Sequence, residues 1–108
     1  MVAEDFRVFS APFDDIRRAV VRTLEEIGAR SLVWSRAYCV VNARARFSWL
    51  NVFLTGGEEL TIVLGRGSGQ VWVQSASFFL SFDFGINRSN CQLVLNKIAD
   101  ILSPTSSG

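Results

Sequence analysis

The middle of the chain places the strongest limit on the fold, because it holds several short strand-like segments in close succession. These segments are residues 31–35, 38–47, 60–64 and 71–74. In most of them apolar residues alternate with other residues, a two-residue period typical of β-strands. Glycine-rich turn signals at 56–57 and 65–69 separate the later segments. Parallel strands need crossovers of a dozen or more residues, so these short intervals predict antiparallel pairing.

Two amphipathic helices are expected, one on each side of this region. The first begins near Ser10 or Pro12, and its apolar stripe has the helical spacing of three and four residues: Phe13, Ile16, Val20, Leu24 and Ile27. Gly28 follows the stripe and is expected to end the helix. Asn87 or Ser89 is expected to cap the second helix. Its stripe consists of Cys91, Val94, Leu95, Ile98, Ile101 and Leu102.

These elements, with a short first strand over residues 5–10, give the order (β)-α-β-β-β-β-α. Each helix has a single apolar stripe, so both helices must bury it against the sheet. The pattern predicts an α+β two-layer sandwich, an antiparallel sheet of four or five strands with two helices on one face. Residues 48–55 fit either a further strand or a loop. Residues 1–103 are expected to form one domain, and the small polar residues 104–108 a flexible C-terminal tail.

The composition argues against most catalytic and metal-binding chemistry. The chain has no histidine, which removes His-dependent triads, His-ligated metal sites and His pH switches. Two cysteines, Cys39 and Cys91, cannot form a zinc site alone. Carboxylates pair only as sequence neighbours, which do not face each other on a helix or strand. We therefore expect no enzyme, no cofactor and no metal site.

The charge pattern argues against a polyanionic partner. Eleven Lys and Arg against ten Asp and Glu leave a net charge of +1. Arg44 and Arg46 share one face of a predicted strand, and with Trp34 and Trp72 they suggest a surface that stacks single-stranded nucleic acid. Acidic residues balance the arginines, so we expect no nucleic-acid partner.

The N-terminal residues and the hydropathy pattern bear on location. Residues 1–10 mix charged and apolar residues and do not have the pattern of a signal peptide. The longest uncharged stretch, residues 67–82, contains Gly, Gln and Ser and is too short and too polar to span a bilayer. We expect no transmembrane segment, a cytoplasmic location and two reduced thiols.

The glycine-rich run over residues 65–69 invites comparison with a phosphate-binding loop. Such loops precede a helix whose N-terminal N–H groups bind the anion. Here a predicted strand follows instead, so the run is interpreted as a hairpin turn.

Large apolar residues are numerous for a small domain, so either some of them form an exposed or partner-covered surface or they pack tightly in an aromatic core with scattered surface Phe. Aromatic residues make up 12% of the chain and charged residues only 19%, against about 25% charged in a typical domain. The densest run lies just before the second helix and contains Phe78, Phe79, Leu80 and Phe82, to which Trp49 is a candidate neighbour. This run fits either a buried strand end or an exposed patch for a partner or an apolar ligand.

The C-terminal third resembles a group of small uncharacterised bacterial domains of unknown function. The resemblance is carried by Val71-x-Val73-x-Ser75-x-Ser77, then Asp83-x-Gly85-x-Asn87, then an amphipathic helix. It implies a shared fold with an S-x-S strand, a D-x-G-x-N turn and a closing helix. From the residues themselves, Asp83, Gly85 and Asn87 are interpreted as a structural turn, in which Asp and Asn cap and Gly adopts a positive φ.

These observations together favour a non-enzymatic binding or assembly module that self-associates, as a homodimer, through exposed aromatic surface. The candidate contact residues are Phe78, Phe79, Leu80, Phe82 and Trp49. The alternative is a carrier that holds a small apolar ligand in a cavity between the helices and the sheet.

Overall fold

The computed structural model describes residues 2–35, 39–45, 58–77 and 86–103. Within them the elements follow the predicted order, a strand, a helix, four strands and a helix. They are β1 (Val2–Val8), α1 (Phe13–Glu26), β2 (Arg30–Ser35), β3 (Val40–Ala45), β4 (Glu58–Leu64), β5 (Gln70–Ser77) and α3 (Ile86–Leu102). The predicted α+β class is confirmed, with five described strands.

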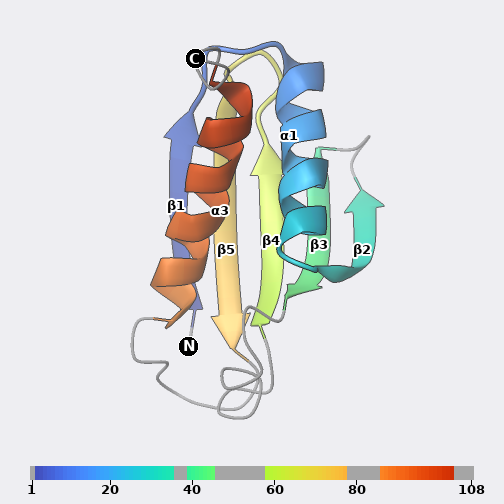
Figure 1. Cartoon of the computed structure of the whole chain (residues 1–108), viewed down its shortest axis with the longest axis vertical. Helices are drawn as coiled ribbons and strands as arrows, with labels where there is room; N and C mark the ends of the chain where they lie inside the picture. Colours follow the sequence, from blue (N-terminus) through green and yellow to red (C-terminus); the bar gives the residue numbers. More distant parts are fainter. Residues whose placement is uncertain (1, 36–38, 46–57, 78–85, 104–108) are drawn as a thin grey trace.

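The sheet is antiparallel throughout and has the strand order β1-β5-β4-β3-β2. The strands β2 to β5 form a meander, and β1 adds to β5 at the outer edge (Figure 1). β1 covers Val2–Val8 rather than residues 5–10, so it starts earlier and ends earlier than predicted. The cause is the chain's turn toward α1, which begins at Phe13 after Pro12 in an extended conformation.

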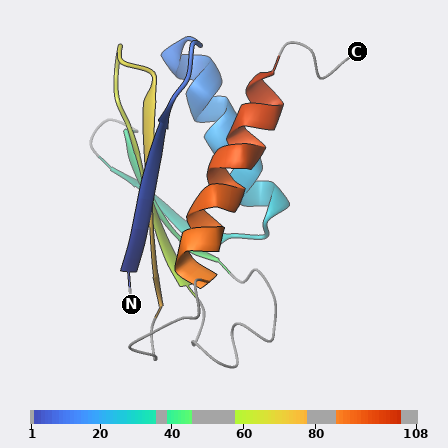
Figure 2. The same cartoon turned by 90° about the vertical axis from the view of Figure 1, so that its left-hand side faces the viewer.

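Both helices lie on one face of the sheet (Figure 2). α3 packs over β1 and β5 and also contacts α1. The core between the two layers includes Val20 and Leu24 of α1, Leu95 and Ile98 of α3, and Leu60, Ile62, Val71 and Val73 of the sheet, all fully buried. The apolar stripes predicted for the two helices are therefore the surfaces that close the core.

One of the two predicted helix ends agrees with the structure and the other does not. Gly28 has a φ of +71°, so it is the left-handed residue that ends α1, as predicted. α3 begins at Ile86, which places Asn87 and Ser89 inside its first turn. The expectation that one of them caps the helix from outside is therefore wrong. The first turn accepts such residues because its N–H groups have no partner within the helix.

Residues 65–69 form the turn between β4 and β5, as predicted. The N–H of Gly65 donates to the carbonyl of Gln70, which closes the hairpin. Gly69 has a φ of +72°, and a Cβ at this position would collide with the Phe9 carbonyl oxygen. The N–H of Phe9 also donates to the Gly69 carbonyl at 2.8 Å. Glycine is therefore required here, because the end of β1 passes directly against the turn.

Candidate interaction surface

The second face of the sheet carries no described helix and is called the open face below (Figure 2). The strand register arranges its side chains in rows that cross the sheet. The apolar row consists of Phe6, Trp72, Val63, Val40 and Ser35. The polar row beside it consists of Glu4, Gln74, Thr61, Asn42 and Val33. Next comes the charged row, with Ala76, Glu59 and Arg44.

Exposed apolar surface on the open face is concentrated on the β1 side. Phe6 is 56% exposed and Val8, two residues along the same strand, is 62% exposed. Trp72 and Val63 are half-buried, and Val40 is buried. At the opposite edge, Val33 on β2 is 59% exposed. Single exposed apolar residues are common, but Phe6 and Val8 adjoin Trp72 and form a continuous patch.

Two pairs of polar side chains on the open face lie across neighbouring strands. The Thr61 hydroxyl donates to Asn42 Oδ1 at 2.8 Å. In the charged row, Arg44 lies opposite Glu59 in the register, an arrangement of opposite charges that favours strand pairing. Trp34 is on the other face, where it packs against the core. Arg44 and Trp34 therefore do not share a surface, and Arg46 lies outside the described residues.

The two edges of the sheet are protected against addition of another strand. At β1, the N–H of Phe6 donates to Asp5 Oδ1 at 2.8 Å, so a neighbouring carboxylate occupies this donor. Arg7 reaches back to α3, where it donates to the Leu95 carbonyl and to Asn96 Oδ1. At β2, the register shifts between Arg30 and Val33, an irregularity that disfavours pairing with another strand. The open face is therefore the described surface of the sheet that neither a helix nor an edge feature of this kind obstructs.

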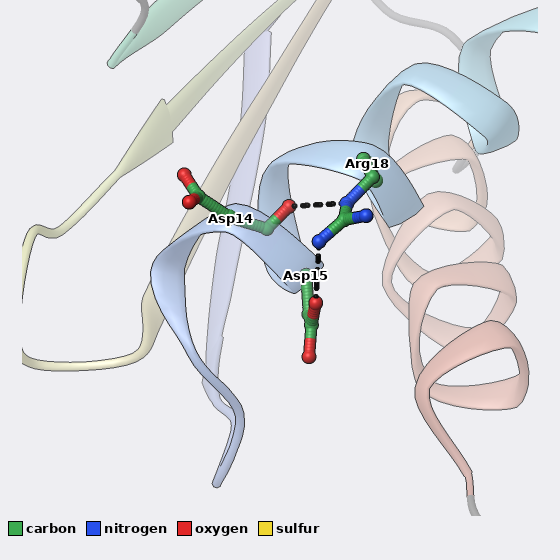
Figure 3. A network of polar contacts seen from close by, with 3 residues as sticks. All are labelled: Asp14, Asp15 and Arg18. Atoms are coloured by element: carbon green, nitrogen blue, oxygen red, sulfur yellow. Dashed lines mark hydrogen bonds and ion pairs between the residues drawn. The ribbon is translucent and has the colours of Figure 1, made fainter.

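A hollow of about 320 Å³ lies where the glycine turn meets the start of α1, lined in part by Pro12, Phe13 and Ser68. Asp14 and Asp15 stand in the first turn of α1, and Arg18 donates to the Asp14 carbonyl and to the Asp15 carboxylate (Figure 3). These carboxylates already interact with the positive end of the helix dipole. The 65–69 run itself leads into β5 and not into a helix, in agreement with the hairpin interpretation.

Cys91 is a free cysteine in α3. Its side chain is fully buried, and its Sγ lies 3.5 Å from the Ala3 carbonyl oxygen and 3.6 Å from that of Val73. Burial raises the pKa of the thiol from 9.0 to about 11. A thiol of this kind stays protonated at neutral pH and is a poor nucleophile. Among the described residues, no cluster of acidic and cysteine side chains could hold a metal ion.

The residues predicted as contacts lie outside the part of the chain that the structure describes. Phe78, Phe79, Leu80 and Phe82 fall in residues 78–85, and Trp49 falls in residues 46–57. Asp83 and Gly85 of the predicted turn also fall in residues 78–85, outside the described part of the chain. These assignments stay predictions. Of the turn residues, only Asn87 is placed, in α3.

The open face was not identified from the sequence, although a signal for it was present. Phe6 and Val8 alternate with Arg7, and Val63 and Trp72 alternate with the residues that fill the core. Large apolar residues on both faces of β4 and β5 are more than a single buried face requires. That excess indicates a second surface that is partly apolar.

The comparisons with known proteins leave the family open. A scan against protein-family models finds no match, and a search of curated proteins finds none either. Among the described residues, no helix is long and apolar enough to cross a membrane.

Proposed function

We propose that this chain is a non-enzymatic assembly module that forms a homodimer through the open face of its sheet. The observation that carries the proposal is the patch of Phe6, Val8 and Trp72 on a face that no described helix covers. Water contact with such a patch is unfavourable, and covering it stabilises an association. A cytoplasmic location with both cysteines reduced is part of the same proposal, and the two free cysteines are compatible with it.

The dimensions of the open face suit a second copy of the chain. Five strands at a spacing of about 4.8 Å span roughly 24 Å, and seven residues at about 3.4 Å give a similar length. The projected area is therefore on the order of 600 Å² before the relief of the side chains is counted. Standard protein interfaces bury about 800 Å² of accessible surface on each partner. The face is therefore of the same order of size as one side of a small specific interface, and the relief of the side chains adds to the projected area.

The experiment is sedimentation velocity over a dilution series, with a matched pair of variants. Phe6→Asp places a charge in the patch, whereas Leu93→Asp makes the same change at an exposed position on α3, 39% exposed and away from the open face. We expect the parent and Leu93→Asp to sediment as dimers and Phe6→Asp to sediment as a monomer. Circular dichroism should show that the Phe6→Asp monomer is folded. A parent that is monomeric at every concentration would refute the proposal.

Two further outcomes would point to the earlier sequence predictions. A dimer that survives Phe6→Asp but dissociates with Phe79→Asp or Leu80→Asp would move the contact to residues 78–82. A monomer whose native mass exceeds that of the chain by a few hundred daltons would favour the carrier of an apolar ligand. The packed core argues against the carrier, because the side chains of Leu60, Ile62 and Leu95 between the helices and the sheet are fully buried.

A further inference from the structure

The arrangement of residues on the open face also indicates how two copies would be oriented, an inference that depends on the proposed function. When two such faces pack with aligned strands, the two-fold axis lies between them. It runs either across the strands or along them. In both cases the apolar row can lie on the apolar row of the partner, but the residues that meet within each row differ.

An axis across the strands places each strand over its own copy. Phe6 then faces Phe6 of the second copy, and Trp72 faces Trp72, so the exposed apolar surface on the β1 side meets its equivalent. An axis along the middle strand, β4, exchanges the two edges of the sheet instead. Phe6 would then face the exposed hydroxyl residue Ser35, and the largest exposed apolar side chain would meet a polar one.

The charged row distinguishes the two orientations a second time. With the axis along β4, Glu59 faces Glu59 of the second copy inside the interface, and like charges repel where water is excluded. With the axis across the strands through the apolar row, Glu59 and Arg44 lie two rows from the axis. Glu59 then comes beside the partner's 65–69 turn at the rim, where its charge stays hydrated.

The residues on the two sides of the apolar row also pair between the two copies. Gln70 and Gln74 lie on β5 at equal distances from Trp72, one on each side. An axis across the strands brings Gln74 of one copy over Gln70 of the other, twice in the dimer. A glutamine amide both donates and accepts hydrogen bonds, so each pair can satisfy its own polar atoms.

We propose that two copies pack open face to open face about a two-fold axis that crosses the strands at the apolar row. Glu4 of one copy then lies over Val8 of the other. With the axis along β4, Glu4 would lie over Val33 instead. These two pairs of residues separate the orientations without altering Phe6 or Trp72.

The experiment is crosslinking between single-cysteine variants, made in a Cys39→Ser background that keeps buried Cys91. Facing sheets are about 10 Å apart, within reach of a short bismaleimide. Each mixture contains Glu4→Cys chains and size-tagged partner chains, Val8→Cys in one mixture and Val33→Cys in the other. We expect a covalent heterodimer in the Val8→Cys mixture, at least tenfold more abundant than in the Val33→Cys mixture or with any variant alone.

The outcomes separate this inference from the proposed function. Crosslinking of Glu4→Cys with Val33→Cys would show a face-to-face dimer with the other axis and overturn the inference alone. A parent that sediments as a dimer, with neither mixture crosslinked, would show that the open faces do not pair in this manner. A monomeric parent would refute the proposed function and this inference together.

Discussion

Cys91 gives a quantitative test of the packing between β1, β5 and α3. Its thiol is fully buried, with a pKa raised by desolvation from 9.0 to about 11. In the unfolded chain the thiol ionises near pH 9, whereas in the folded chain it stays protonated to higher pH. Between these values the folded state binds more protons, so the free energy of unfolding falls as pH rises. The contribution is complete below pH 9 and is lost as pH rises to about 11.

The size of the effect follows from the shift. One pKa unit corresponds to about 1.4 kcal/mol, so the full contribution is about 2.7 kcal/mol. Between pH 8 and pH 10 the expected loss from this group is about 1.3 kcal/mol. Urea unfolding measured at both pH values, for the parent and for Cys91→Ala, isolates this loss because all other titrating groups are common to both. The parent should lose about 1.3 kcal/mol more than the variant.

Equal losses in the two proteins would refute the reasoning. That result would mean that the Cys91 thiol reaches water in the folded state, and that α3 does not seal the core over Ala3 and Val73. A thiol-reactive probe gives an independent check at pH 8. Half-buried Cys39 should react before unfolding, and Cys91 only at the rate of opening or unfolding.

Three substitutions test other features of the fold by chemical denaturation. Thr23→Val should raise the free energy of unfolding by about 1 kcal/mol, because the buried Thr23 hydroxyl has no hydrogen-bond partner among the described residues; a loss of stability would indicate a hidden partner. Gly69→Ala should destabilise the fold more than Gly67→Ala, since both have positive φ but only Gly69 abuts the Phe9 backbone; equal costs would contradict that contact. Leu60→Ala should cost about 2–5 kcal/mol, and a cost below about 1 kcal/mol would contradict the dense core.

The predicted elements were accurate where one periodicity continued over many residues. The stripe on α1 and the stripe on α3 both bury against the sheet, and the short interval between β4 and β5 requires a hairpin. Gly28 ends α1 as expected because only a left-handed residue continues the chain there without strain. The helix start at Ile86 was missed because Asn and Ser suit both the cap position and the first turn.

The site was less accessible to sequence reasoning. The dense run at residues 78–82 drew the prediction because its apolar residues are adjacent in the chain. The patch on the open face is formed instead by Phe6, Val8 and Trp72, from two strands separated by more than sixty residues. Only the pairing of β1 with β5 brings them together, and no local pattern reports that pairing.

The sequence alone determined the class of the fold, because periods of 3.6 and two residues decide which segments are helices and which are strands. Alternation along β1 also separates Phe6 and Val8 from Ala3 and Arg7, but it does not state which set faces the core. Tertiary structure decided that question. α3 packs against the side with small Ala3, where Arg7 can reach the helix carbonyl of Leu95. Phe6 and Val8 lie on the open face as a consequence, because successive side chains of a strand point to opposite faces of the sheet.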